Sequence, residues 1–531
     1  MTRGTPRPYR HAGAGAGARR ISHRYQSRVP GSHLSFRSRH TRPIGGTEEQ
    51  HVSDSTDTVF DITVIGGGPG GYAVAFRAAA RGLTVAMIEE DRIGGTCLNR
   101  GCIPSKSILH VAGVLDELKH ASTFGLDVTI NGLDGVALDA FRTGVMDKLR
   151  SGLQSLADKR TTFMTGRGRL TDVSADVKTV TVTDAEGATT DVRSRHVVLA
   201  TGSVVRHVPG WEVDGEVIQT SDQALWFMQA PKRAIIIGAG AIGMEFASMW
   251  HPMGTSVTVV EALDRVLPLE DPASSKTVAR SFKKRKIDVR VKTSVVGVSR
   301  DGDVGKVIVE SNGNVEELEA EVVLVAVGRA PNTADTGAAE AGVLDERGFV
   351  DTDDLGQTKV SGVWAVGDVR PTLALAHAAF AEGFVVADAI AGLDVKPVDH
   401  TQTPKVTYCN PEVASVGLTE PEAIAAHGEV HTTQYSLKAN AKGIIHNSDG
   451  FVKVIAAKVP VDAVHPDGIG PVLGVHIVGP SATDLIGEAT LATSWEALPE
   501  ELAAITHAHP TLYEAMGEAF QAIAGLPFHG H

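Results

Sequence analysis

The chain contains 531 residues, of which 42% are hydrophobic and 57 are glycines. This length and composition predict an α/β protein of about three or four domains. The formal net charge of −13 argues against nucleic acid as a partner, because phosphate binding depends on clustered Lys and Arg. No apolar run approaches the ~18 residues that cross a bilayer, so we expect a soluble protein without a membrane partner.

Residues 1–47 contain no Asp or Glu and are rich in Arg, His, Gly and Ser. We predict that residues 1–57 form a basic, disordered extension. Such a segment resembles an organellar transit sequence, which would place the protein in the mitochondrial matrix. The alternative, which we favour, is that translation starts at Val52, because valine codons serve as bacterial starts. The protein would then be cytoplasmic.

A dinucleotide-binding βαβ unit is predicted from residue 60 onward, where the apolar run FDITVI leads into GGGPGG, a helical stretch and a second strand. Gly66 permits a tight turn, Gly68 allows a pyrophosphate to approach the backbone, and Gly71 allows close helix packing. Glu89 ends the second strand and is expected to hold ribose hydroxyls. The alternative is a βα turn that uses glycine for packing alone.

The next segment, GGTCLNRGCIPSK, places Cys97 and Cys102 with four residues between them. The whole chain has three cysteines, so structural disulfides are a poor explanation and a redox-active thiol pair is favoured. The alternative is a structural disulfide that only closes the local loop. Closing so short a loop would contribute roughly 2 kcal/mol, and a reducing cytosol would oppose it.

A second unit of the same kind starts with RAIII, followed by GAGAIGME, a helix and the strand SVTVV. Gly238, Gly240 and Gly243 occupy the fingerprint positions. Glu261 follows the first of these glycines by the same 23 residues that separate Glu89 from Gly66. A carboxylate here favours the free ribose hydroxyl of NAD over the phosphate of NADP, although Arg265 lies close by in sequence.

Three further turns follow apolar strands. LATGS, with Thr201 and Gly202, and VAVGRAPN, with Gly328, close the two nucleotide units. VWAVGD ends in Asp368, where a carboxylate could grip a ribityl chain, although a Gly-Asp pair after a strand is commonly a simple turn. From Pro404 onward the pattern changes to β-rich runs and a final helical portion, which predicts a separate α+β domain.

The C-terminal motif HAHPTLYE offers a candidate base. We predict that Pro510 occupies the first position of a helix and holds His509 in an extended conformation. Glu514 would then accept a hydrogen bond from one imidazole nitrogen and keep the other basic. His507 lacks the following proline. The alternative for this spacing is helix capping and solvated charge.

Taken together, GGTCLNRGCIPSK, GAGAIGME, VWAVGD and HAHPTLYE resemble, in content and order, the pyridine nucleotide-disulfide oxidoreductase family, and within it the dihydrolipoamide dehydrogenases. The resemblance covers about residues 60–520. It implies FAD on the first unit, NAD on the second, and a C-terminal domain that forms a homodimer.

The fold class implied is α/β, with two Rossmann-like nucleotide-binding domains and a C-terminal α+β interface domain. The expected limits are 58–202 and 329–400 for the two parts of the FAD-binding domain, 203–328 for the NAD-binding domain and 401–531 for the interface domain.

The family motifs also imply roles for individual residues. Cys97 would exchange with substrate and Cys102 would lie nearest the flavin. Lys106 and Glu245 would pair beside the isoalloxazine, and His509, held by Glu514, would come from the partner subunit. We also expect Thr201, Gly202, Gly328, Asp368, Ala376 and His377 among the cofactor-binding residues.

The expected reaction is oxidation of a dithiol by NAD. Only a thiolate attacks a disulfide, and a thiol of pKa near ~8.5 is mostly protonated at neutral pH, so a base such as His509 is required. The expected partners are lipoyl-bearing acyltransferases of 2-oxoacid dehydrogenase complexes or glycine-cleavage carrier proteins.

Two alternatives stay open. An NAD(P)H-dependent reductase of mycothione or glutathione disulfide shares the two-cysteine core, although no arginine cluster follows Glu261. A flavin-bearing binding module with idle thiols is the other. Cys409 has no partner at a useful spacing and is predicted to be a buried apolar filler.

Overall fold

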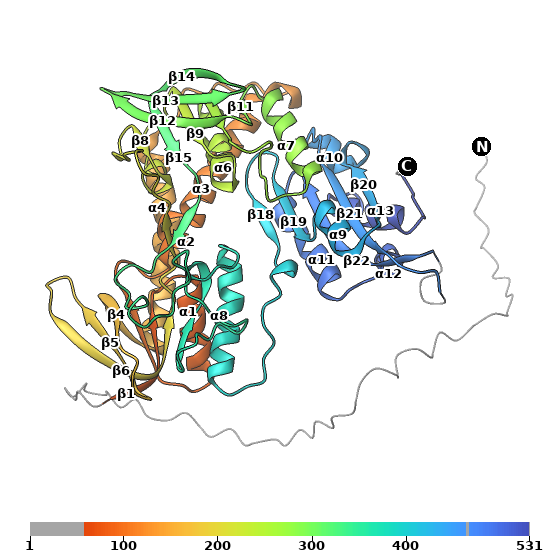
Figure 1. Cartoon of the computed structure of the whole chain (residues 1–531). Coiled ribbons are helices and arrows are strands. Elements are labelled where there is room, and N and C mark those ends of the chain that lie inside the picture. The colour runs from red at the N-terminus through yellow and green to blue at the C-terminus, as the bar shows by residue number, and fades with distance from the viewer. Residues whose placement is uncertain (1–57, 463–466, 530–531) are drawn as a thin grey trace, which may run out of the picture. The chain divides into compact units, whose positions relative to one another are not determined.

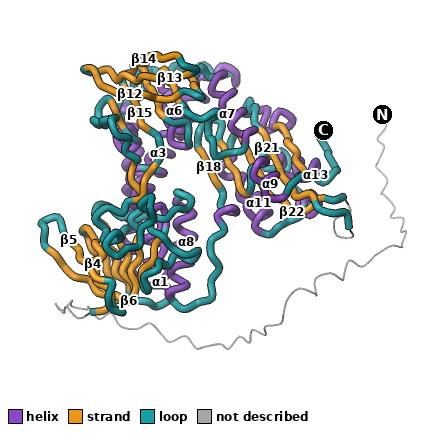
Figure 2. The backbone as a smooth tube through the Cα atoms, in the orientation of Figure 1, coloured by secondary structure: helices purple, strands orange, loops and turns teal. Residues whose placement is uncertain are grey.

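The computed structural model describes residues 58–462 and 467–529, so the predicted extension over residues 1–57 lies outside the described residues. Figure 2 shows the described chain as a mixture of strands and helices, in agreement with the predicted α/β class. Within the described ranges, no helix is long and apolar enough to cross a membrane.

The first nucleotide unit is built on a seven-stranded sheet. Strands β3, β2, β1 and β6 run parallel in that order, β17 also pairs with β6, and antiparallel β5 and β4 extend the sheet. The last four residues of β1 are buried because helices cover the sheet, which explains why three of these four side chains are apolar. The bounds are β1 Val59–Ile65, β2 Val85–Glu89, β3 Thr162–Thr165, β4 Arg167–Asp172, β5 Lys178–Thr183, β6 Thr189–Leu199 and β17 Val363–Ala365.

Two helices distant in sequence, α1 (Pro69–Ala80) and α8 (Ala376–Ile390), lie side by side against this sheet (Figure 1). They approach closely at Gly383, where a β-carbon would come within 2.9 Å of the carbonyl oxygen of Gly70. The carboxylate of Asp388 on α8 accepts hydrogen bonds from Arg77 and Arg81, which hold its pKa well below the usual range. Residues after 329 therefore complete the first unit.

The second nucleotide unit has its own parallel sheet, in the order β11-β10-β9-β15-β8, next to a three-stranded antiparallel sheet β12-β13-β14. Helix α6 follows β9 and buries most of its residues, including Trp250. The strand bounds are β8 Ile218–Gln219, β9 Arg233–Ile237, β10 Ser256–Val260, β11 Asp288–Arg290, β12 Ser294–Asp301, β13 Val304–Ser311, β14 Asn314–Ala320 and β15 Val322–Val325. The helices are α5 Ser221–Ala224, α6 Ala241–Trp250, η2 His251–Met253 and α7 Pro272–Lys284.

A two-stranded antiparallel sheet stands where the chain enters and leaves this second unit. Strand β7 (Ser203–Val205) pairs with β16 (Arg329–Pro331), with Val204 opposite Ala330. The two crossings between the nucleotide units are therefore adjacent.

Three α-helices and one short 3₁₀ helix link β2 to β3. Helix α2 (Gly95–Arg100) and helix α3 (Cys102–Lys119) meet at Gly101, and the long α4 (Gly135–Arg160) is capped by the side chain of Asp134, which accepts from two backbone N–H groups. Helix α3 also packs against α6 of the second unit. The short helix η1 spans Ala121–Phe124.

The C-terminal domain is an antiparallel sheet in the order β18-β19-β22-β21-β20, with helices α11 and α13 packed on it around a core that includes Met516 and Phe520. The predicted fold class is thus confirmed, including the separate α+β domain. The strands are β18 Lys405–Thr407, β19 Val413–Gly417, β20 Val430–Ser436, β21 Phe451–Lys458 and β22 Ile469–Val478. The helices are η4 His400–Gln402, α9 Glu420–His427, η5 Leu437–Ala439, α10 Ala441–Ile445, α11 Ala482–Ser494, α12 Pro499–Ala503 and α13 Glu514–Ile523, whereas η3 Gly367–Val369 follows β17 in the first nucleotide unit.

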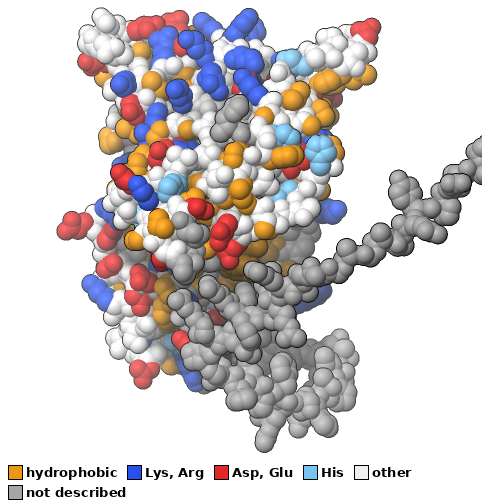
Figure 3. All heavy atoms as spheres, turned by 90° about the vertical axis from the view of Figure 1, so that its right-hand side faces the viewer, with side chains coloured by type: hydrophobic (Ala, Val, Ile, Leu, Met, Phe, Trp, Pro, Cys, Tyr) orange, Lys and Arg blue, Asp and Glu red, His pale blue; other side chains and the backbone are white. Residues whose placement is uncertain are grey.

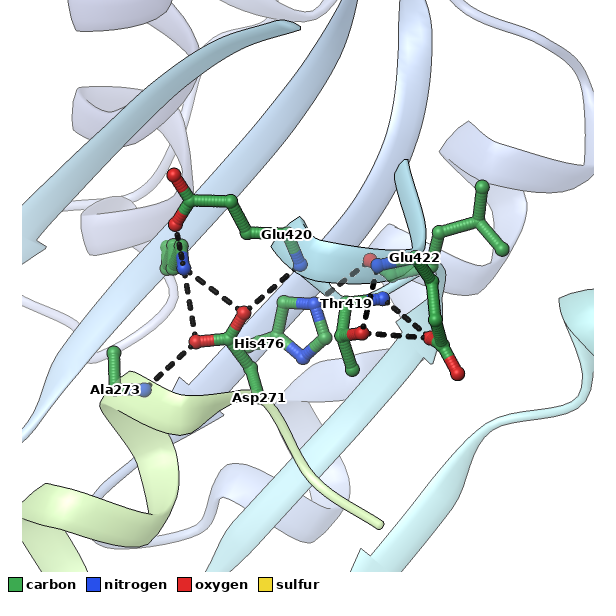
Figure 4. A network of polar contacts seen from close by, with 8 residues as sticks. Asp271, Ala273, Thr419, Glu420, Glu422 and His476 are labelled. Atoms are coloured by element: carbon green, nitrogen blue, oxygen red, sulfur yellow. Dashed lines mark hydrogen bonds and ion pairs between the residues drawn. The ribbon is translucent and has the colours of Figure 1, made fainter. Parts of the chain in front are cut away.

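A buried polar network joins the second nucleotide unit to this domain (Figure 4). Asp271 is fully buried, caps helix α7 through the N–H of Ala273 and accepts two hydrogen bonds of 2.9 Å from Lys453 on β21. Lys453 also pairs with Glu420, 2.6 Å away. Nearby, burial lowers the pKa of His476 to about 4. Each buried charge has a partner, as a water-excluded site requires.

Candidate active site

The two cysteines lie next to each other at the junction of two helices. Cys97 is within α2 and Cys102 is the first residue of α3, and their thiols share a hydrogen bond. Both side chains are partly buried free thiols. The turn at Gly101 between them is tight, since a β-carbon there would lie 3.0 Å from the carbonyl oxygen of Thr96.

The electrostatic surroundings distinguish the two thiols. The hydrogen bond from Cys97 lowers the pKa of Cys102, burial raises it, and the positive charge of Lys106 lowers it. The net result is a pKa lowered to about 7. The same hydrogen bond and burial raise the pKa of Cys97. Cys102 also stands at a helix N-terminus, where the helix dipole favours a thiolate. Cys102 is therefore the better thiolate and the better leaving group.

The Lys106–Glu245 pair expected from the family motifs is present. Nζ of Lys106, one turn along α3, lies 3.0 and 2.9 Å from the two carboxylate oxygens of Glu245 on α6. The ammonium also lies over the ring of Tyr408, 4.6 Å from its centroid. The N–H of Tyr408 donates to Glu245 as well. Sequence reasoning missed Tyr408, which lies 163 residues from Glu245 and carries no local signal.

The first glycine-rich turn has the geometry its sequence requires. Gly66 has φ +108°, and a β-carbon on Gly71 would lie only 1.9 Å from the carbonyl oxygen of Gly66. The N–H of Gly67 donates to Glu89 at 2.6 Å. Glu89 is nearly fully buried, and this burial raises its pKa.

The second turn repeats this arrangement. A β-carbon on Gly243 would lie 1.9 Å from the carbonyl oxygen of Gly238, and the N–H of Ala239 donates to Glu261 at 2.7 Å. A β-carbon on Gly240 would meet no atom within 4 Å. The guanidinium of Arg265 donates to the carbonyl of Pro268, so it is engaged within its own loop.

Other predicted cofactor residues gather near the crossing between the units. Asp368, in η3, accepts from the hydroxyl of Ser203 at 2.6 Å, and Arg329 donates to the same hydroxyl. Thr201 donates to the carbonyl of Asn332, and the N–H of Asn332 donates to Gly202. This network holds both strand ends beside the first turn.

The remaining expected residues occupy glycine turns or a helix start. Gly328 has φ +105° and a β-carbon there would meet no atom within 4 Å. Ala376 and His377 open helix α8, and Nε2 of His377 lies 2.7 Å from the carbonyl oxygen of Pro404. His377 thus ties the first unit to the segment that leads into the C-terminal domain.

His509 and Glu514 are in contact, with Nδ1 of His509 3.0 Å from Oε2 of Glu514. The prediction that Pro510 starts a helix is wrong, because α13 begins only at Glu514. A turn at Thr511 replaces the expected first helical turn. Its hydroxyl donates to the carbonyl of Ala508 and accepts from the N–H of Glu514.

Glu514 is held by a residue that sequence reasoning missed. The side-chain amide of Asn440, only 1% exposed, donates to Oε1 of Glu514 and to the carbonyl of Thr511, and its oxygen accepts from Gly443. His507 has a structural role: its side chain is only 6% exposed, and its Nε2 lies 2.9 Å from Glu488. The imidazole of His509, by contrast, is 76% exposed.

The described chain does not bring all the predicted catalytic groups together. Among residues 58–462 and 467–529, no hydrogen bond joins His509 or Glu514 to Cys97 or Cys102. Cys409 is buried, and its thiol donates to the carbonyl of Pro411, which confirms the prediction that it is a buried filler.

Comparison with known proteins identifies the family. The family model described as pyridine nucleotide-disulphide oxidoreductase matches residues 60–383, and the dimerisation domain of the same family matches residues 403–520. The chain belongs to this family.

Relatives within the family match nearly the whole described chain. A dihydrolipoyl dehydrogenase from Bacillus subtilis is 38% identical over 480 residues, which cover 89% of this chain and 99% of the relative. One from Mycobacterium bovis is 39% identical over 473 residues, 88% and 99% of the two chains. The crystal structure of LpdA from Mycobacterium tuberculosis superposes with a TM-score of 0.80 at 27% identity, and covers 88% of this chain and 100% of that chain.

As a member of the pyridine nucleotide-disulphide oxidoreductases, the chain is an NAD-dependent oxidoreductase with FAD as its second cofactor. The residues fit both groups. Gly68 and Gly240 are the N-cap residues of helices α1 and α6 and supply no side-chain cap, so the first N–H groups of both helices are free to bind pyrophosphate. Glu89 and Glu261 keep spare lone pairs for ribose hydroxyls.

Proposed function

We propose that the chain oxidises protein-bound dihydrolipoamide to lipoamide with NAD as acceptor, through a Cys97–Cys102 redox disulfide and FAD. The observation that carries this proposal is the asymmetric thiol pair beside the Lys106–Glu245 ion pair. The dihydrolipoyl dehydrogenases that match the chain over most of its length support it.

The sulfur chemistry follows from the asymmetry of the pair. A substrate thiolate attacks Sγ of Cys97, which forms a mixed disulfide and expels Cys102 as a thiolate. This direction is favoured because a thiol of lower pKa leaves faster, and the pKa of Cys102 is lowered to about 7. The second substrate thiol then closes the lipoyl disulfide and leaves Cys97 reduced, so that two electrons rest on the enzyme dithiol.

The proton removed from the substrate thiol is assigned to His509. Glu514 accepts the hydrogen bond from Nδ1, which leaves Nε2 as the base, and Asn440 fixes the carboxylate. The same imidazole then returns a proton to Cys97 as it leaves the mixed disulfide. Bound FAD supplies two-electron transfer between the reduced cysteines and NAD.

We assign Lys106 and Glu245 to the flavin ring, and Asp368 to its ribityl chain. Gly66, Gly68, Gly71, Glu89, Thr201 and Gly202, together with Ala376 and His377, are assigned to the rest of FAD. Gly238, Gly240, Gly243, Glu261 and Gly328 are assigned to NAD. The position of Arg265, turned to Pro268, supports NAD over NADP. The limits of the FAD-binding, NAD-binding and interface domains stay proposals.

The proposed enzyme is a homodimer in which His509 serves the cysteines of the partner subunit. The family's dimerisation domain supports this arrangement, as does the exposure of His509. The same domain exposes large apolar side chains, which marks an interaction surface: Ile444, Ile445, Leu491, Trp495 and Ile505.

The proposed partners are lipoyl-bearing acyltransferases of 2-oxoacid dehydrogenase complexes or glycine-cleavage carrier proteins, because these present the dithiol on a mobile arm. We propose a cytoplasmic location, with the mitochondrial matrix as the alternative should residues 1–50 act as a transit segment.

A steady-state assay tests the proposal. The purified FAD-loaded enzyme is given dihydrolipoamide with NAD, and in parallel mycothione or glutathione disulfide with NADH or NADPH. We expect the first pair to give a kcat/KM at least about 100-fold above the others. Dominance of either low-molecular-weight disulfide would instead establish the reductase alternative, and an unchanged flavin spectrum with every substrate would establish an inert binding module.

A further inference from the structure

A cleft outside the redox site lies between helix α7 of the second nucleotide unit and the edge of the C-terminal sheet. Its volume is about 370 Å³, which is within the range of small-molecule sites. The lining residues are Ala273, Lys276, Thr277 and Arg280 from α7, and Gln434, Ser436, Lys438, Asp449, Gly450 and Phe451 from the C-terminal domain.

The α7 side of the cleft carries unpaired positive charge. Lys276 and Arg280 are exposed, stand four residues apart on one face of the helix, and form no hydrogen bond or ion pair with any described residue. Like charges at this spacing repel each other and destabilise the helix. Lys283, one turn further, adds a third exposed cation.

The opposite wall does not neutralise this charge. Asp449 is the only acidic lining residue, and its carboxylate is already shared by Lys438 at 3.0 Å and Lys284 at 3.3 Å. The cleft is therefore strongly cationic in a chain whose net charge is −13. Figure 3 shows Lys and Arg side chains gathered in the upper part of the face it displays.

We propose that this cleft binds a small polyanion that carries phosphate groups. The guanidinium of Arg280 can bind a phosphate through two parallel N–H bonds, Lys276 supplies a point charge, and the amide of Gln434 can donate from the other wall. A small ligand is favoured over a nucleic acid because Lys276, Arg280 and Lys438 line a single cleft of about 370 Å³, while the chain as a whole is acidic.

The site would couple the two domains that form it. Asp271 caps the same helix and is bound to Lys453, whose register partner on β20 is Gln434 of the cleft. A polyanion that bridges Arg280 and Gln434 would therefore reinforce the existing link between α7 and the C-terminal sheet. The inference is independent of the proposed dithiol substrate, because binding alone is predicted.

The test measures binding of inorganic tripolyphosphate to the FAD-loaded enzyme by isothermal titration calorimetry. Saturating NAD is present so that the nucleotide-binding helix N-termini are filled. ATP forms a second arm, which separates a nucleotide ligand from inorganic phosphate. The double variant K276Q/R280Q is compared with K359Q/K396Q, which removes two exposed lysines elsewhere.

We expect saturable binding of one anion per chain to the unmodified enzyme and to K359Q/K396Q, and at least tenfold weaker binding to K276Q/R280Q. Arg280→Lys, which keeps the charge but loses the planar donor pair, should lie between them. Equal affinity in both double variants, no saturable binding, or binding of long polyanions such as heparin alone would each overturn the proposal.

Discussion

The two nucleotide units have the same backbone arrangement at their glycine turns but differ in what surrounds it. In both, a backbone N–H at the glycine turn donates to the acid that ends the second strand, at 2.6 Å for Glu89 and 2.7 Å for Glu261. In both, the loop after the second strand also donates a backbone hydrogen bond of 2.8 Å to the glycine turn. The donor is Gly94 and the acceptor Gly67 in the first unit; in the second, Leu267 donates to Ala239.

The two units differ in the segment that comes directly after that loop. After Gly94 the chain enters α2 with Cys97, and Gly95 lies 3.8 Å from where a β-carbon on Gly68 would be. After Leu267 the chain continues to Asp271 and helix α7, which packs against the C-terminal sheet. The first turn is thus covered by the redox segment and the second stays open. In the proposed assignment, the same framework holds tightly bound FAD in the first unit and exchanging NAD in the second.

Removal of either redox sulfur should have the largest effect, because only the first unit carries chemistry in its loop. We expect Cys97→Ser and Cys102→Ser each to lower dihydrolipoamide oxidation at least about 1,000-fold while FAD stays bound. Stopped-flow and absorbance measurements check both effects. Cys409→Ala is the matched control and should keep its turnover; normal turnover in either serine variant would remove the basis of the mechanism.

The base belongs to neither nucleotide unit, so its loss should spare both. We expect His509→Gln to slow dithiol oxidation about 100-fold, because an unassisted substrate thiol is mostly protonated at neutral pH. His427→Gln, at another exposed histidine, should have no effect. FAD content and NAD affinity are measured alongside, and a near-normal rate for His509→Gln would reassign the base.

Matched substitutions of the two acids should separate the two turns. Glu261→Ala should raise the KM for NAD roughly tenfold, because about 1.4 kcal/mol of ribose hydrogen bonding is lost, with FAD content unchanged. Glu89→Ala should instead lower FAD content. Should Glu89→Ala affect NAD and Glu261→Ala affect FAD, the assignment of the units would be reversed.

The smallest effect concerns the pH dependence of the reduced enzyme. The pKa of Cys102 is lowered to about 7, so its thiolate fraction, and with it the rate of iodoacetamide alkylation, should rise only about twofold between pH 7 and 8. An ordinary thiol would rise about eightfold. Cys97→Ala removes the hydrogen bond and should restore the steeper dependence. An unchanged profile in that variant would show that Cys97 does not stabilise the thiolate.

Sequence alone predicted the features that are encoded locally. The spacing of Gly66, Gly71 and Glu89 predicted a βαβ unit because each residue meets a requirement of one turn. The start of α13 was misplaced, because Thr511 closes a turn after the proline and the helix begins only at Glu514. Pairs such as Lys106 with Glu245 came only from the family resemblance, since 139 residues separate them.

The residues that were missed share a cause. Asn440 is 74 residues from Glu514 and Tyr408 is 163 residues from Glu245, so neither has a motif of its own. The cationic cleft has the same origin, because α7 and β20 contribute to it from separate domains. Such contacts arise from tertiary packing, which residue spacing does not encode.

Because strands β7 and β16 are paired, the second nucleotide unit is an insertion whose two ends are adjacent. Its entrance and exit are neighbours, with Val204 opposite Ala330, so a short hairpin turn could replace the whole segment between them without moving the ends apart. The first nucleotide unit is closed without it by the pairing of β17 with β6 and of α8 with α1. Such an architecture would allow the second unit, to which we assign NAD, to be exchanged for one of different specificity while the segment that carries the two cysteines keeps its structural support.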